Sequence, residues 1–128
     1  MTLKTETRHA IDPQTAKGLD TDGLRAHFHK DGLFAEGEIN LVYTHYDRLI
    51  LGSAVPAGTA LTLDHMAETG TPGFLDRREM GILNIGETGE VEVGGGEGGQ
   101  GPRFRKEIPV LIEVLQVSAL EVAGIAEP

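Results

Sequence analysis

The 128-residue chain has no cysteine and no tryptophan, and aromatic residues make up only 5% of it. The absence of cysteine excludes disulfides, thiolate nucleophiles and cysteine-based zinc sites. Basic residues are scarce as well, because eleven Lys and Arg stand against twenty Asp and Glu, which gives a formal net charge of −9. We therefore expect no nucleic-acid partner, since binding to DNA or RNA needs a basic surface.

Long apolar segments are also missing. No stretch approaches the roughly 18 apolar residues that a membrane-spanning helix needs, and residues 1–13 lack the apolar segment of a secretory signal peptide. These absences predict a soluble, cytoplasmic protein with no membrane partner. The length and a hydrophobic content of 39% predict one domain, or half of a larger one.

The first part of the chain predicts an extended arm and one short helix. Residues 1–13 are polar and without a clear period, which predicts a mobile or edge-pairing arm. A capped helix is expected from about Asp22 to His29, ended by Gly32, because Leu24 and Phe28 fall four positions apart.

The strongest strand signal lies in residues 38–52, a run of β-branched, aromatic and apolar residues broken by Asp47 and Arg48. It predicts either one strand bent at this charged pair or two strands that meet there. A turn is expected at residues 56–58, and the alternation of residues 60–63 predicts a further strand.

Residues 73–93 predict a hairpin that follows three consecutive charged residues, Arg77, Arg78 and Glu79. A strand is expected over Met80–Ile85, a tight turn over Gly86–Gly89, and a returning partner strand at Val91–Val93. Short strands that recur with Gly and Pro between them are typical of a sandwich or barrel. The predicted fold class is therefore all-β with one short helix.

The sequence changes character after Val93. Six glycines within residues 94–101 predict a flexible linker or loop. A phosphate-binding loop is less favoured, because the Gly-Lys-Ser/Thr ending of such loops is missing. Residues 107–126 fit a helix face as well as strands, and the pattern leaves both open.

His27 and His29 form a His-x-His pair, the spacing at which two imidazoles on a strand can converge on one metal ion. Here the pair falls in the predicted helix, where such residues point about 200° apart. The next glutamate, Glu36, lies beyond a glycine turn. Two surface histidines are the favoured interpretation, and no metal ligand is assigned.

Tyr43, His45 and Asp47 alternate along the predicted strand and would share one face. They offer a phenol, an imidazole and a carboxylate, but such a row is more often a structural ladder than a catalytic site, because geometry and pKa must both suit a substrate. No GxSxG, HExxH, CxxC or EF-hand pattern occurs, so no catalytic residue is identified.

Arg77 and Arg78 are the candidate substrate-binding residues. A guanidinium pairs bidentately with a carboxylate, so either arginine could hold a sugar acid. A salt bridge within the chain or between subunits is the commoner use in a sequence with twenty acidic residues. Because neighbours on a strand point to opposite faces, at most one of the two is expected to point inward.

Three blocks carry a resemblance to a known family: GLDTDGLRAHF from Gly18, INLVYTHYDRLILG from Ile39, and FLDRREMGILNIGETGEVEV from Phe74. In this order and spacing they resemble the N-terminal part of the 5-keto-4-deoxyuronate isomerases, also called 4-deoxy-L-threo-5-hexosulose-uronate ketol-isomerases. The resemblance covers roughly residues 8–94.

The resemblance implies two cupin-like jelly-roll barrels in one chain, a homo-oligomer that is usually a hexamer, and one zinc ion per subunit. It also implies a uronate substrate from pectin breakdown, with 5-dehydro-4-deoxy-D-glucuronate and 3-deoxy-D-glycero-2,5-hexodiulosonate as the interconverted sugars. Such an isomerisation needs a base for a proton next to a carbonyl and an electrophile for the enediolate oxygen, a role that zinc can take.

In this family three histidines and a glutamate of the C-terminal barrel hold the zinc, and that barrel is not in this chain. No ligand is therefore assigned to His27, His29 or His45. The resemblance stops at Gly94, which predicts an incomplete N-terminal cupin-like domain over residues 1–94 and a Gly-rich linker with a divergent tail over residues 95–128.

A frameshift or truncated reading frame would produce such a break, and we expect it to leave sheet edges without partners and the chain alone inactive. Two other hypotheses stay open. The chain could be a non-catalytic cupin-like assembly module, or an unrelated small jelly roll that binds a sugar acid.

Overall fold

The computed structural model describes residues 2–63, 65–94, 103–108 and 114–118. The chain divides into two compact units, Met1–Glu68 (unit 1) and Thr69–Pro128 (unit 2). Strands outnumber helices among the described residues, and this confirms a mainly β fold. The domain boundary expected at Gly94 stays a prediction.

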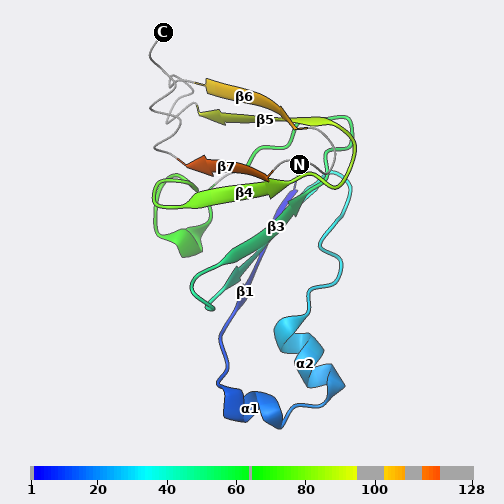
Figure 1. Cartoon of the computed structure of the whole chain (residues 1–128), viewed down its shortest axis with the longest axis vertical. Helices are drawn as coiled ribbons and strands as arrows, with labels where there is room; N and C mark the ends of the chain where they lie inside the picture. The colour runs from blue at the N-terminus through cyan, green and yellow to red at the C-terminus, as the bar shows by residue number, and fades with distance from the viewer. Residues whose placement is uncertain (1, 64, 95–102, 109–113, 119–128) are drawn as a thin grey trace. The chain divides into compact units, whose positions relative to one another are not determined.

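The N-terminal arm forms strand β1 (Thr2–Arg8), which pairs in parallel with β2 (Glu38–Thr44) (Figure 1). A parallel pair needs a long crossover, and residues 9–37 provide it. The edge-pairing alternative for the arm is thus confirmed. An alternation that predicts a strand is present in the sequence, since Thr5 and Thr7 alternate with charged residues.

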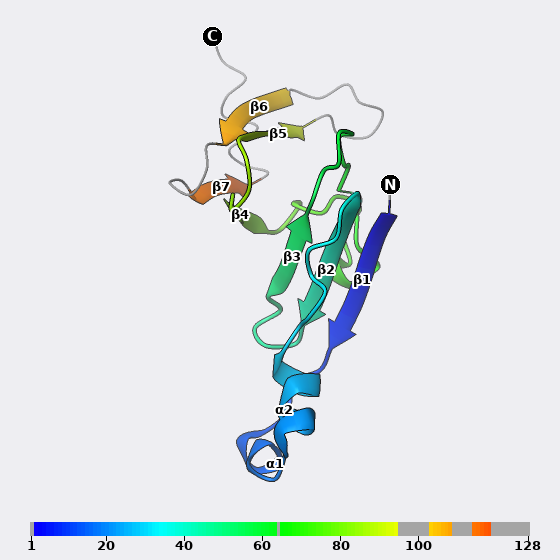
Figure 2. The same cartoon turned by 90° about the vertical axis from the view of Figure 1, so that its right-hand side faces the viewer.

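The crossover contains two short helices, α1 (Pro13–Lys17) and α2 (Thr21–Phe28). Both views show them beyond the end of the sheet at which β1 finishes (Figure 1, Figure 2). The helix predicted from about Asp22 to His29 is confirmed to within one residue at each end. The prediction of a single helix is wrong, because α1 has the signature of a helix start, an Asp12 N-cap followed by proline.

Strands β2 and β3 (Ile50–Ala54) form an antiparallel hairpin, so the alternative of two strands meeting at Asp47 and Arg48 is the one observed. Both residues have positive φ, 52° and 56°, the pattern of the turn type whose twist matches a two-residue hairpin. The amide of Leu49 donates to the carbonyl of Tyr46 at 3.1 Å and closes the turn.

Strand β2 is the centre of the core of unit 1. Residues 39–43 are all buried, because β1 and β3 flank the strand and both of its faces are covered. Leu41 and Tyr43 occupy one face and Val42 the other. On the Val42 face, the hydroxyl of Ser53 in β3 donates to the carbonyl of Leu33 and fixes the chain that leads into β2.

The strand predicted for residues 60–63 is wrong, because this segment is irregular. Its Leu61 and Leu63 are half-buried, and a loop that lies against a core produces the same alternation as a strand. The loop leads to Met66, which is only 2% exposed, and to the 3-10 turn η1 (Ala67–Thr69).

Unit 2 contains two separate two-stranded ribbons: β4 (Glu79–Leu83) pairs with β7 (Val114–Ser118), and β5 (Gly89–Gly94) pairs with β6 (Arg103–Ile108). Both pairs are antiparallel. The predicted β4–β5 hairpin is therefore wrong.

The segment between β4 and β5 is held by local bonds of a single side chain. The amide group of Asn84 accepts from the backbone N–H of Gly86 at 3.0 Å and donates to the carbonyl of Glu87 at 2.8 Å. Asn84 thereby satisfies the backbone groups here without a ladder between the two strands.

The C-terminal tail forms strands wherever it is described. Strand β7 lies in residues 107–126, whose structure the sequence left open, whereas β6 begins before them at Arg103. Each gives a strand of the 73–93 region a partner. Each of these strands thus has a partner on one edge, and the expectation of unpaired sheet edges stays a prediction. The glycine-rich residues 95–102, and residues 109–113 and 119–128, lie outside the described part of the chain.

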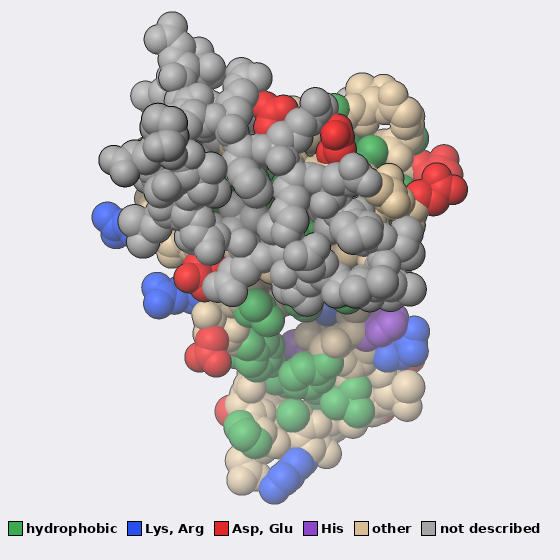
Figure 3. All heavy atoms as spheres, turned by 45° about the horizontal axis from the view of Figure 1, so that its top comes forward, with side chains coloured by type: hydrophobic (Ala, Val, Ile, Leu, Met, Phe, Trp, Pro, Cys, Tyr) green, Lys and Arg blue, Asp and Glu red, His purple; other side chains and the backbone are tan. Residues whose placement is uncertain are grey.

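Several large apolar side chains stay on the surface, and Figure 3 shows hydrophobic groups gathered in the lower part of its view. In unit 1 these exposed side chains are Leu24, Phe28, Phe34, Tyr46, Leu49 and Leu51, and in unit 2 they are Leu83 and Ile85. Within the described residues, no helix has the length and apolar content that crossing a bilayer requires.

Candidate functional site

A cluster of acid–base side chains lies where β1 and β2 end side by side. The rings of His9 and His45 stack with centroids 4.6 Å apart and planes within 7°, and Tyr43 meets His45 edge-on at 5.3 Å. The backbone explains the pairing, because Arg8 lies opposite Thr44 in the parallel register and the next residues are the two histidines. We name His9, Tyr43 and His45 the histidine cluster.

A carboxylate also reaches this face of the sheet. Thr7 lies opposite Tyr43 in the register, and its hydroxyl donates to Glu68 Oε1 at 3.3 Å. Tyr43 is buried, whereas both histidines are exposed. The face therefore offers imidazole, phenol and carboxylate groups, which can move protons when a substrate is held against them.

The histidine cluster does not suit a shared metal ion. A metal binds an imidazole nitrogen in the plane of the ring, at about 2.0–2.1 Å for zinc. Two stacked rings with nearly parallel planes have no common position for such an ion. Among the described residues, no three His, Asp or Glu side chains gather into a group that could hold a metal.

The sequence prediction for Tyr43, His45 and Asp47 is half right. Tyr43 and His45 do lie together, but β2 ends at Thr44 and Asp47 sits in the turn with positive φ, so it leaves the shared face. His9 was not predicted as a member of this group, because only the parallel register of β1 against β2 brings it beside His45.

The other histidine pair is divided by the end of a helix. His27 lies in the last turn of α2, half-buried and tilted against Phe28 at 6.3 Å. His29 is the C-cap residue with extended backbone (φ −113°, ψ 140°). Both residues were predicted to lie in the helix, but only His27 lies within α2 as observed.

Arg77 and Arg78 lie in the turn that precedes β4, not in a strand. The turn is held by Asp76, whose Oδ2 accepts from the backbone N–H of Gly73 at 2.8 Å. Arg77 is exposed and Arg78 is half-buried. The two arginines therefore do not alternate as neighbours on a strand do, although their side chains differ in exposure. Their role in substrate binding stays a prediction.

Charged residues form a small network around Glu6 and Arg8, which alternate with Thr7 along β1 and so belong to the opposite face of the sheet from Tyr43. Glu6 accepts from Arg8 Nε at 2.6 Å and from Lys30 Nζ at 2.7 Å. The hydrogen bond from Lys30, and then that from Arg8, lower the pKa of Glu6 below its ordinary value of 4.5. On the same strand pair, Lys4 lowers the pKa of Glu38 by a hydrogen bond of 2.6 Å. These cations are thus already engaged with carboxylates of the chain.

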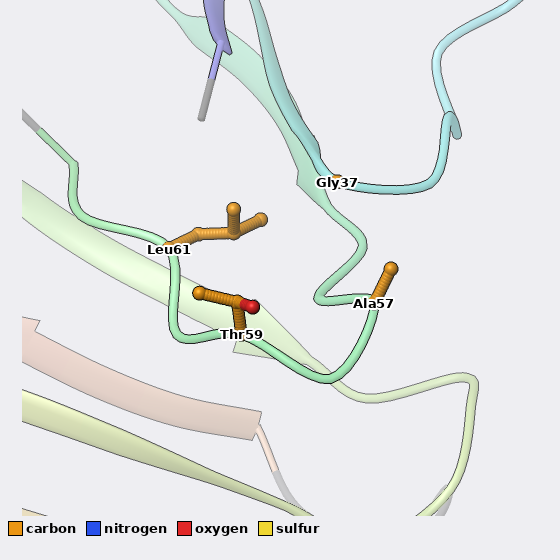
Figure 4. Close-up of a pocket in the computed structure, with 4 residues that line it drawn as sticks. All are labelled: Gly37, Ala57, Thr59 and Leu61. Carbon is orange, nitrogen blue, oxygen red and sulfur yellow. The ribbon is translucent and has the colours of Figure 1, made fainter.

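A pocket of about 200 Å³ lies in unit 1, lined by Gly37, Ala57, Thr59 and Leu61 (Figure 4). It is smaller than the roughly 300–1,000 Å³ of typical ligand sites. The Thr59 hydroxyl is the one polar side-chain group among these four residues. The described lining residues of the pocket therefore offer no charge for a uronate carboxylate.

The comparisons with known proteins converge on one enzyme family, although no protein-family model matches the sequence. The chain is 62% identical over 92 residues to a 4-deoxy-L-threo-5-hexosulose-uronate ketol-isomerase of Agrobacterium fabrum, and 60% identical over 90 residues to one of Cereibacter sphaeroides. It is 49% identical over 88 residues to ketol-isomerase 2 of Rhizobium meliloti.

These matches cover 69–72% of this chain but only 31–34% of each relative. The chain thus spans about a third of the length of the curated relatives it matches, in keeping with an N-terminal part. By its sequence, the chain is a homologue of the N-terminal part of the 4-deoxy-L-threo-5-hexosulose-uronate ketol-isomerases.

Proposed function

We propose that this chain is the N-terminal portion of a ketol-isomerase that acts on 4-deoxy-L-threo-5-hexosulose-uronate in the cytoplasm, and that it supplies scaffold rather than the reacting groups. The observation that carries the proposal is the identity of 60–62% to relatives of that name. The reaction would interconvert 5-dehydro-4-deoxy-D-glucuronate and 3-deoxy-D-glycero-2,5-hexodiulosonate.

The chemistry of the described residues supports the scaffold role. An aldose–ketose shift needs a base beside the carbon that loses its proton and an electrophile for the enediolate oxygen. The two histidine rings of the cluster are stacked, and none of the described residues that line the pocket is charged. The described residues do not fit a zinc ion, so we propose that a catalytic zinc is held by polypeptide outside this chain.

A cupin-like jelly roll is the proposed parent fold. The support is the nested pairing of unit 2, in which β5–β6 lies between the paired strands β4 and β7 along the chain. Nested hairpins of this kind are the pairing order of a jelly roll folded from one long ribbon. The complete family member is proposed to be a homo-oligomer, with the hexamer of the family as the expected state.

Arg77 and Arg78 are proposed to bind the uronate carboxylate in the complete enzyme, because a guanidinium can pair with it bidentately. The test is Arg77→Lys, which keeps the charge and loses the planar fork. If this arginine holds the substrate, KM rises at least about tenfold with kcat nearly unchanged. An unchanged KM would remove Arg77 from the site.

The proposal is tested by restoring the missing polypeptide. Isomerisation is assayed with added zinc in three samples. The first is the full chain alone, and the second is the full chain co-expressed with the remaining two thirds of the Agrobacterium fabrum relative. The third is a fusion of residues 1–94 to that same part of the relative. We expect no turnover by the chain alone and turnover in at least one assembly. Turnover by the chain alone would overturn the scaffold role, and no turnover in either assembly would overturn the family function.

The frameshift hypothesis has its own test at the level of the gene. Sequencing of the genomic locus is expected to show, in another frame downstream, a His-x-His with a nearby Glu and a later His. An uninterrupted frame with a genuine stop after Pro128 would contradict it. The non-catalytic assembly module remains the alternative, favoured by the exposed apolar side chains of unit 1.

A further inference from the structure

Unit 1 exposes an apolar surface that starts on α2 and continues onto the β2–β3 hairpin. Leu24 and Phe28 lie on one face of α2, 42% and 54% exposed. The ring of Phe28 lies next to that of Tyr46 in the hairpin, with the two ring centroids 6.1 Å apart. Leu49 follows in the same turn and is 55% exposed. We call Leu24, Phe28, Tyr46 and Leu49 the α2 surface.

The helices beside this surface have little to stabilise them. Helix α1 has five residues, α2 has eight, and neither contains a buried side chain. Isolated helices shorter than about 12–15 residues are marginal in water. Their N-caps, Asp12 and Asp20, contribute typically about 1 kcal/mol each. A helix of this length with an apolar face outward needs a partner to cover it.

The lengths of the relatives indicate what the partner is. The relatives are about three times as long as the matched segment, so they contain polypeptide that this chain does not. Two of the three blocks that carry the family resemblance include the α2 surface. A second copy of this chain is disfavoured as the partner, because two chains with a net charge of −9 each repel one another.

From these observations we infer that the α2 surface is the docking site for the polypeptide that forms the remaining two thirds of the family's chain. The inference rests on the proposed function, since it takes the missing portion of a ketol-isomerase as the occupant. Docking buries the apolar face of α2 and stabilises both helices.

The absence of cysteine makes a single introduced thiol a clean probe of this surface. Leu24→Cys places the thiol on the apolar face of α2, and Ala26→Cys is the matched control. Ala26 is exposed and lies about 200° around the same helix from Leu24. Each full-chain variant is labelled with a maleimide, alone and co-expressed with the remaining two thirds of the Agrobacterium fabrum relative. The cysteine-free chain in the same assembly gives the background.

We expect labelling of Leu24→Cys to slow at least about tenfold in the assembly, because a covered thiol reacts only through opening. Labelling of Ala26→Cys should change less than about twofold. Equal labelling of Leu24→Cys in an assembly that isomerises the uronate would overturn the inference and leave the proposed function standing. Loss of turnover in every assembly would count against the proposed function instead.

Two further outcomes overturn the inference. Labelling of Leu24→Cys that slows as the chain alone becomes more concentrated would show that a second copy covers the surface. Failure of the chain to form a complex with the added polypeptide would show that this polypeptide is not the occupant.

Discussion

Unit 1 and unit 2 are built from similar short strands but differ in what their strands pack against. In unit 1, β2 has a strand on each side, and every buried side chain among those described lies in this unit. In unit 2, each described strand has one partner. A two-stranded ribbon is marginally stable on its own, whereas a third strand allows a buried centre. The comparison teaches that, among the side chains whose burial is described, the buried strand is the one with a neighbour on each side.

The largest effect is expected from removing part of the β2 core. Leu41 is 7% exposed, and Leu41→Ala should lower the free energy of unfolding by about 2–4 kcal/mol. The matched variant Leu83→Ala in β4, where leucine is 60% exposed, should change it by less than about 0.5 kcal/mol. Urea unfolding followed by circular dichroism measures both. Equal losses would show that unit 2 has a comparable core.

A smaller effect is expected from adding a methyl group to β3. A Cβ at Gly52 would lie 2.5 Å from Leu41 Cδ2 and 3.0 Å from the carbonyl oxygen of Asn40. Gly52→Ala should therefore cost about 1–3 kcal/mol of unfolding free energy. Gly89→Ala in β5, where a Cβ has nothing within 4 Å, should be neutral or stabilising by about 0.5 kcal/mol. Thermal unfolding of both variants measures the difference. A larger loss of stability in Gly89→Ala than in Gly52→Ala would contradict the comparison of the two units.

The β2–β3 turn offers a gain in stability. Arg48 has a φ of 56°, a conformation that glycine adopts without strain. Arg48→Gly should raise the free energy of unfolding by about 0.5–1 kcal/mol, because the strain of an L-residue there exceeds the added chain entropy of glycine. Arg77→Gly, at a residue without positive φ in unit 2, should give no gain. A destabilised Arg48→Gly would show that contacts of the Arg48 side chain outweigh its backbone strain.

The smallest effect concerns pH. Because its pKa is lower in the folded chain than its ordinary value of 4.5, Glu6 contributes stability above that pH. This contribution is lost as pH falls below 4.5 through the pKa of the folded state, and its size is less than about 1 kcal/mol for an exposed ion pair. Glu6→Gln should flatten this part of the pH–stability curve, and Lys30→Gln should weaken it. If neither variant changed the pH–stability curve below pH 4.5, the ion pairs of Glu6 would not contribute to stability.

Local patterns predicted the elements of unit 1 well. Helix α2 follows from its Asp20 cap and the Leu24–Phe28 spacing, and β2 follows from its apolar, β-branched run, because both depend on neighbours in sequence. The prediction of a strand at residues 60–63 was wrong, because alternating apolar and polar residues indicate half-burial and do not show that a segment pairs with another strand. The N-terminal strand could be predicted only as one of two alternatives.

The pairing of strands that are distant in the chain could not be predicted from the sequence. Nothing near His9 indicates that it will meet His45, because the parallel register over more than thirty residues decides this. Similarly, the β4–β5 hairpin was the local expectation, but each strand pairs with a tail strand instead. Arg77 and Arg78 were chosen as candidates by residue type alone. Their position in a turn was not predicted, because it depends on the hydrogen bond that Asp76 accepts from Gly73.

The order of strands along the chain has a consequence for protein synthesis. The sheet of unit 1 is complete in the polypeptide once Ala54 has left the ribosome, because β1, β2 and β3 all precede that point. In unit 2, β4 must wait for β7, whose last residue is Ser118. A nascent chain therefore has its N-terminal sheet available early, while β4 emerges and stays without its partner through most of the later translation.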